Sequence, residues 1–171
     1  PVGYRIAFAP SRPADIWVPS TNLHYRTRDG GKSWSDFRVE GQDVYAMAVD
    51  PQNPDIVYAG GHGGEQAHLA RSDDGGKSWK PVGAGLEPPI VALVVDPANG
   101  NALYAASRSG QLAKSVDRGA TFTALAVPLG GTDDIYTLRF EPGKADHLWL
   151  ASEKGLFRTT DGGASWQRSD R

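Results

Sequence analysis

The sequence predicts an all-β protein built from four similar units. Three observations carry this prediction: a turn motif that occurs four times, an alternating apolar segment that recurs in phase with it, and a composition rich in turn residues. The 171 residues include 21 glycines and 12 prolines, and few stretches have the spacing of an amphipathic helix. Such a composition favours many short strands joined by tight turns.

The turn motif is eight residues long. It reads Ser or Thr, any residue, Asp, any residue, Gly, any residue, Ser or Thr, and then Trp or Phe. Successive copies are separated by 43 to 45 residues, and a near-constant period of this length indicates a structural repeat. The aspartates and aromatics of the four copies are Asp29 and Trp34, Asp74 and Trp79, Asp117 and Phe122, and Asp161 and Trp166.

Each unit also predicts four strands. The first strand alternates apolar residues with small ones and ends just before Pro10, Pro51, Pro97 or Pro142, and alternation with a period of two is typical of a strand. A second strand follows, a third enters the turn motif and a fourth leaves it. Four short antiparallel strands in about 43 residues match one blade of a β-propeller. We therefore expect one domain over residues 1–171, with blades at about 1–39, 40–84, 85–127 and 128–171.

The residue types of the motif indicate a structural role for it. Aspartate accepts backbone N–H groups and glycine supplies a positive φ, while Ser or Thr hydroxyls close the same turn. The aromatic residue fills space between sheets. We expect the four aspartates to be structural rather than catalytic or metal-binding, and the small residues of the first strands, such as Ala7, Ala46, Ala48 and Ala92, to allow close contact between blades.

The four motifs resemble Asp boxes, also called BNR repeats. These occur in sialidases, in xyloglucan-hydrolysing propeller enzymes, in sortilin-type receptors and in photosystem assembly factors. The resemblance covers essentially the whole chain and implies a β-propeller. It does not imply one function, because the box marks blades in proteins with unrelated activities.

The number of blades leaves their arrangement open. Four is the lower limit for a propeller, and the sequence has no extra strand that would complete a blade across a ring closure. An open arc would expose a strand edge and two apolar faces. The alternatives are a four-blade ring, two chains that complete an eight-blade ring, and a part of a longer propeller. We expect a homo-oligomer or a part of a longer propeller rather than the small ring.

The candidate ligand-binding residues lie on the face opposite the Asp boxes, in the loops between strands two and three and between blades. The longest of these loops, Gly60–His68, contains His62, Glu65 and His68. These side chains could ligate a divalent metal, but so glycine-rich a loop does not preorganise them. The loop is expected to be solvated or to contact a ligand, and no metal or cofactor is predicted. The other candidates are Arg108, Asp133 and Glu153.

Two functions fit these features. The first is a non-catalytic binding or scaffold module that recognises a protein or a glycan through its loop face, as the regular blades and short loops suggest. The second is a part of a glycoside hydrolase. Tyr4-Arg5-Ile6-Ala7 is similar to the sialidase motif Phe/Tyr-Arg-Ile-Pro, whose arginine binds the substrate carboxylate, but alanine replaces the proline. The xyloglucan-hydrolysing enzymes carry Thr-Asp-x-Gly-Gly between strands two and three, whereas Ser107-Arg-Ser-Gly and Ser152-Glu-Lys-Gly stand here.

Composition excludes other partners. A net charge of −2 gives no electrostatic basis for binding nucleic acid, and the longest apolar runs are too short to insert into a membrane. The chain has no cysteine, so it forms neither disulfides nor cysteine metal sites. The compartment is not determined by these features, with a secreted or periplasmic location favoured.

Overall fold

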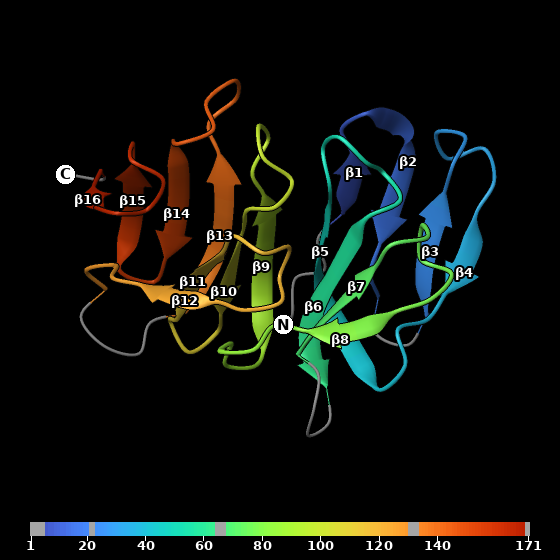
Figure 1. Cartoon of the computed structure of the whole chain (residues 1–171), viewed down its shortest axis with the longest axis horizontal. Helices are drawn as coiled ribbons and strands as arrows, with labels where there is room; N and C mark the ends of the chain where they lie inside the picture. The colour runs from blue at the N-terminus through green and yellow to red at the C-terminus, as the bar shows by residue number, and fades with distance from the viewer. Residues whose placement is uncertain (1–5, 21–22, 64–67, 130–133, 170–171) are drawn as a thin grey trace.

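The computed structural model describes residues 6–20, 23–63, 68–129 and 134–169. Over these ranges the protein is all-β, with four separate four-stranded antiparallel sheets (Figure 1). Each sheet is one blade, and its strands follow one another in chain order. The predicted all-β propeller with four four-stranded Asp-box blades is confirmed. No helix in the described part of the chain is long and apolar enough to cross a membrane.

The strands of each blade run from an inner first strand to an outer fourth strand. Blade 1 consists of β1 (Ala7–Ala9), β2 (Arg12–Val18), β3 (His24–Thr27) and β4 (Ser35–Phe37). Blade 2 consists of β5 (Gln42–Val49), β6 (Val57–Gly63), β7 (Leu69–Ser72) and β8 (Lys80–Val82). Blade 3 consists of β9 (Ile90–Val95), β10 (Leu103–Ser107), β11 (Leu112–Ser115) and β12 (Thr123–Leu125). Blade 4 consists of β13 (Ile135–Phe140), β14 (Leu148–Ser152), β15 (Gly155–Thr159) and β16 (Gln167–Arg168).

The inner strands bring the blades together. β1 contacts β5, β5 contacts β9, and β9 contacts β13. Blades 1 and 4 extend to opposite ends of the molecule, with β4 at one end and β16 at the other (Figure 1). Among the described strands, no strand of blade 1 packs extensively on a strand of blade 4. The four blades therefore form an arc.

The hydrophobic core lies between the blades rather than inside any one of them. We call the side of a blade that faces the preceding blade in sequence its leading face, and the other side its trailing face. Three buried clusters fill the three junctions of blades 1 and 2, 2 and 3, and 3 and 4. Small inner-strand residues let the backbones approach, and the buried positions of Ala7, Ala46, Ala48 and Ala92 confirm that expectation.

The Asp boxes are the turns between the third and fourth strands, and their hydrogen bonds are local. In the first box, the Asp29 carboxylate accepts the Thr27 hydroxyl (2.7 Å), the Ser33 hydroxyl (2.5 Å) and the Ser33 N–H (2.9 Å). The Gly31 N–H donates to Thr27 Oγ1 (2.9 Å). Equivalent bonds close the other three boxes. The glycine at the fifth position has a positive φ in every copy, which explains why this position is glycine.

Candidate functional site

A groove of about 480 Å³ runs along the inner strands, and all four blades contribute to it. Its volume lies within the range of roughly 300–1,000 Å³ that is typical of ligand pockets. The walls are mostly apolar. The lining includes Ile6, Phe8, Met47, Val94, Phe140 and Arg139.

The turns that follow the inner strands form one end of this groove. The Asp50 carboxylate accepts the N–H groups of Gln52 (2.8 Å) and Asn53 (2.9 Å), which holds the turn that places Pro51 in the lining. The Asp96 carboxylate repeats the arrangement in the next blade, beside Pro97. A proline there adds apolar surface without an N–H group that would need a partner. The groove end is therefore apolar and is formed by hydrogen-bonded turns.

Arg139 is the charged side chain in the described lining of the groove. It occupies the inner-strand position that Ala7, Ala48 and Val94 hold in the other blades. Its Nη1 donates to the Leu138 carbonyl (2.8 Å), and the side chain is otherwise exposed. The described residues of the lining include no carboxylate, so this part of the groove offers an apolar surface with one positive charge.

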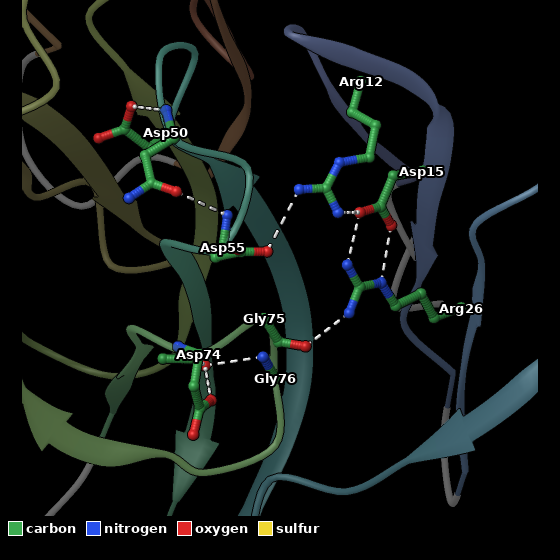
Figure 2. Close-up of polar contacts among 10 residues, drawn as sticks. Arg12, Asp15, Arg26, Asp50, Asp55, Asp74, Gly75 and Gly76 are labelled. Carbon is green, nitrogen blue, oxygen red and sulfur yellow. Dashed lines mark hydrogen bonds and ion pairs between the residues drawn. The ribbon is translucent and has the colours of Figure 1, made fainter.

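Polar contacts link blades 1 and 2 (Figure 2). Arg26 donates to the buried Asp15 carboxylate through Nε (2.7 Å) and Nη2 (2.5 Å), and its Nη1 donates to the Gly75 carbonyl of blade 2 (2.5 Å). Arg12 bonds both Asp15 (3.4 Å) and Asp55 of blade 2 (3.3 Å). Both arginines thus link the blades.

The Asp-box carboxylates are held ionised. Hydroxyl and backbone donors keep the pKa values of Asp29, Asp74 and Asp161 well below their usual range, with the Ser hydroxyl after each aspartate as the largest cause. The Thr121 hydroxyl lowers the pKa of Asp117 to about 2. A general acid needs the opposite shift, so these aspartates are unsuited to that role, and their hydrogen bonds close the turns.

The loop-face candidates do not form one compact site in the described residues. His62 is exposed and His68 half-buried, with their ring centroids 6.5 Å apart. The Arg108 N–H donates to the Pro89 carbonyl and the Glu153 N–H to the Asp134 carbonyl, while both side chains are exposed. Glu65, Asp133, Tyr4 and Arg5 lie outside the described residues. No three His, Asp or Glu side chains among those described are grouped as metal ligands.

A second hollow of about 550 Å³ lies on the outer rim between blades 1 and 2. Exposed, long side chains form much of its wall, including Arg38, Lys77 and Lys80 around Trp79. It belongs to one junction, whereas the axial groove is built by every blade. We therefore take the axial groove as the candidate site.

Arg139 is not among the loop-face residues that the sequence indicates as candidates. A signal for it was present, because a basic residue interrupts the fourth inner strand at a position that is small or apolar in the other three. Aligning the four units position by position would have found it.

Comparisons with known proteins agree with this architecture. Residues 67–171, more than half of the chain, match the sequence profile described as Sortilin, neurotensin receptor 3. The chain belongs to the Sortilin-Vps10 family. No curated protein matches the sequence.

Solved structures place this family member among propellers of different kinds. The GH74 enzyme of Niastella koreensis is 26% identical, with a TM-score of 0.76 over 96% of this chain and 24% of that one. An ancestral GH74 enzyme is 22% identical, with a TM-score of 0.80 over 98% of this chain and 24% of that one. YCF48 bound to D1 peptide is 14% identical, with a TM-score of 0.57 over 98% of this chain and 81% of that one. The chain spans about a quarter of the length of the GH74 enzymes.

Proposed function

We propose that this chain is a non-catalytic module that binds an extended polypeptide segment in the axial groove. The observation that carries the proposal is the groove itself, which has apolar walls from four blades and, among its described lining residues, one cation, Arg139. Apolar side chains of a bound segment would be removed from water there. A carboxylate of the segment would pair with the guanidinium of Arg139.

The comparisons support a polypeptide ligand. The family profile carries the name of a receptor, neurotensin receptor 3, and one of the similar propellers has been solved with a bound peptide. Among the ligand classes that the sequence left open, protein is therefore favoured over glycan. The loop-face residues His62, Arg108 and Glu153 are the second region to test.

A glycoside hydrolase part is the alternative, because the Niastella koreensis GH74 enzyme is 26% identical over nearly the whole chain. Hydrolysis of a glycosidic bond needs two carboxyl groups that face it, roughly 5–10 Å apart. The described groove lining contains none, and the loops that match the catalytic segment have Arg108 or Glu153 where that segment has Asp. Binding without hydrolysis fits these residues better.

The test is fluorescence anisotropy with labelled probe peptides of alternating apolar residues, each made with a free and with an amidated C-terminus. The free-acid peptides should bind more tightly. Arg139→Glu should weaken their binding about tenfold or more, Arg139→Lys should weaken it less, and Lys77→Glu, the same charge change on the Asp-box turn of blade 2, should leave it unchanged.

Three outcomes would overturn the proposal. Arg139→Glu without effect would exclude the groove, and loss of binding in Arg108→Glu instead would move the site to the loop face. Turnover of xyloglucan oligosaccharides or sialosides by the chain would establish a hydrolase.

A further inference from the structure

The junction between consecutive blades is built in the same way three times. The aromatic of each following Asp box packs on the trailing face of the blade before it. Trp79 lies against Trp17 and Phe37, with ring centroids 6.4 and 6.2 Å apart. Phe122 joins the cluster of Tyr58 in blade 2, and Trp166 joins the cluster of Tyr104 in blade 3.

The glycine at the fifth position of each following box lets the box turn lie close to the aromatic ring of the blade before it. A Cβ atom on Gly76 would lie 2.5 Å from the Trp17 ring, and one on Gly163 would lie 3.6 Å from the Tyr104 ring. The box of blade 1 differs, since a Cβ atom on Gly31 would meet only its own Trp34, at 3.7 Å. The first box therefore has the glycine that allows close packing on another blade, but no described residue of another blade lies against it.

A polar bond accompanies each junction. The basic residue of the third strand donates to the carbonyl of the residue after the next box aspartate. These bonds run from Arg26 Nη1 to Gly75 (2.5 Å), from Arg71 Nη1 to Arg118 (3.4 Å) and from Lys114 Nζ to Gly162 (3.4 Å).

The trailing face of blade 4 carries the same groups, and no Asp box in the described part of the chain packs on them. Trp149, which stands where Trp17, Tyr58 and Tyr104 are fully buried, is only half-buried. The Arg158 guanidinium lies over its ring at 5.2 Å, as that of Arg26 lies over Trp17 at 3.9 Å. Arg158 bonds Glu141 and His147 through Nη2, while its Nη1 has no acceptor among the described residues and its buried Nε has no partner.

The leading face of blade 1 carries the matching half of a junction. Trp34 is 49% exposed, whereas Trp166 is 8% exposed. Phe8 is 58% exposed, whereas Val49, at the same place in blade 2, is 5% exposed. Ile6 and Tyr25 add to this surface, and its inner edge, Ile6 and Phe8, is also the blade 1 edge of the axial groove. Large apolar residues collected on one face mark an interaction surface.

We propose that a second copy of this chain closes both faces, with the Asp box of blade 1 in one copy docked on blade 4 of the other. The first box, Asp29–Trp34, has the same six-residue sequence as Asp74–Trp79, whose docking on blade 1 the structure shows. In the proposed junction Trp34 packs on Trp149, and Arg158 Nη1 donates to the Gly30 carbonyl. The two faces lie at opposite ends of the arc (Figure 1), so a two-fold axis generates both junctions at once.

Light scattering across a dilution series tests this proposal. The chain should have twice its 18.3 kDa mass. Trp34→Glu and Arg158→Glu should each raise the dissociation constant of the dimer by about tenfold or more, while circular dichroism remains that of the wild type. Val116→Glu is the matched control, because Val116 is 70% exposed in the box of blade 3 and should leave the mass unchanged.

Mixing the two interface variants tests whether the dimer forms through this junction or through a different contact. Trp34→Glu retains an intact blade 4 and Arg158→Glu retains an intact blade 1, so their mixture should recover one junction and form a heterodimer that neither variant forms alone. A folded wild-type chain that is monomeric throughout the series would overturn the proposal, as would dimers that both variants leave intact. Because this experiment measures mass, a failure of the dimer proposal is distinguishable from a failure of the peptide-binding proposal.

Discussion

The boxes of blades 1 and 2 have the same sequence from aspartate to tryptophan and different surroundings. Their carboxylates accept the same hydroxyl and backbone donors at nearly equal distances. Trp79, however, packs on the aromatic rings of blade 1, while Trp34 is about half exposed. The box turn is therefore a local structure, and the burial of its aromatic depends on a neighbouring blade.

The same contrast holds at the other face of the blades. Arg26 is enclosed by its own blade and the next one, and it bonds both. Arg158 has the equivalent position in blade 4, but it bonds Glu141 and His147 of its own blade. Equivalent residues therefore contribute differently to stability according to whether a blade covers them.

The largest difference is expected between Arg26→Ala and Arg158→Ala. Removing Arg26 leaves Asp15 as a fully buried carboxylate with only the more distant Arg12 nearby, and loss of one partner of a buried pair costs about 3–5 kcal/mol. Arg158→Ala should cost far less, because Glu141 keeps Lys144 as a partner at the surface. Urea unfolding at concentrations where the chain is monomeric measures both.

A control distinguishes the buried charge from lost packing. Replacing both members in Arg26→Met with Asp15→Leu should restore much of the free energy of unfolding. If Arg26→Ala and Arg158→Ala lowered the free energy of unfolding equally, burial under a neighbouring blade would not determine how much these arginines stabilise the fold.

The second prediction compares the two tryptophans. Trp79→Ala should cost about 3 kcal/mol, because it opens a cavity between Trp17 and Phe37. Trp34→Ala should cost less than about 1 kcal/mol in the monomer, as surface substitutions do. The same urea titrations measure this pair, and a cost for Trp34→Ala as large as that for Trp79→Ala would mean that blade 1 is covered in solution even in the monomer.

What the sequence predicts and what it leaves out follow from the range of the interactions. The Asp-box bonds join residues two to four positions apart, so their residue types reveal them. The inner strands are visible because larger apolar residues alternate with small or polar ones along most of their sequence. The bond from Arg26 to Gly75 joins residues 49 positions apart, and the residue types at its ends are ordinary. The basic residue before every box was visible in the sequence, but its role depends on how blades stack.

The axial groove was missed for the same reason. Phe8, Met47, Val94 and Arg139 come from four blades, and alternation alone shows only that each belongs to an inner strand. Their convergence is a property of the stacked blades. The loop-face hypothesis relied instead on an irregular, glycine-rich segment, and the described ends of that segment contribute His62 and His68 without a third ligand group.

The smallest expected effect is the loss of stability when an Asp-box carboxylate is replaced, and a neighbouring blade should not change it. Asp117 has a pKa of about 2 in the folded protein, against an ordinary value of 3.8, because the Thr121 hydroxyl and backbone bond its ionised form. A lowered pKa means that its contribution to stability is complete above pH 3.8 and is lost as the pH falls towards 2. Asp117→Asn should therefore destabilise the chain at neutral pH, and the gap to the wild type should narrow between these values.

Asp29→Asn and Asp74→Asn extend this test to the comparison of the two identical boxes. Donors within the box lower both pKa values, so both variants should lose similar stability at neutral pH even though only one box is covered by a blade. Asp36→Asn, which removes an exposed charge outside the box, is the control. Thermal unfolding followed by circular dichroism over this pH range measures the set. A markedly larger loss in Asp74→Asn would show that the neighbouring blade supports the turn itself and not only its tryptophan.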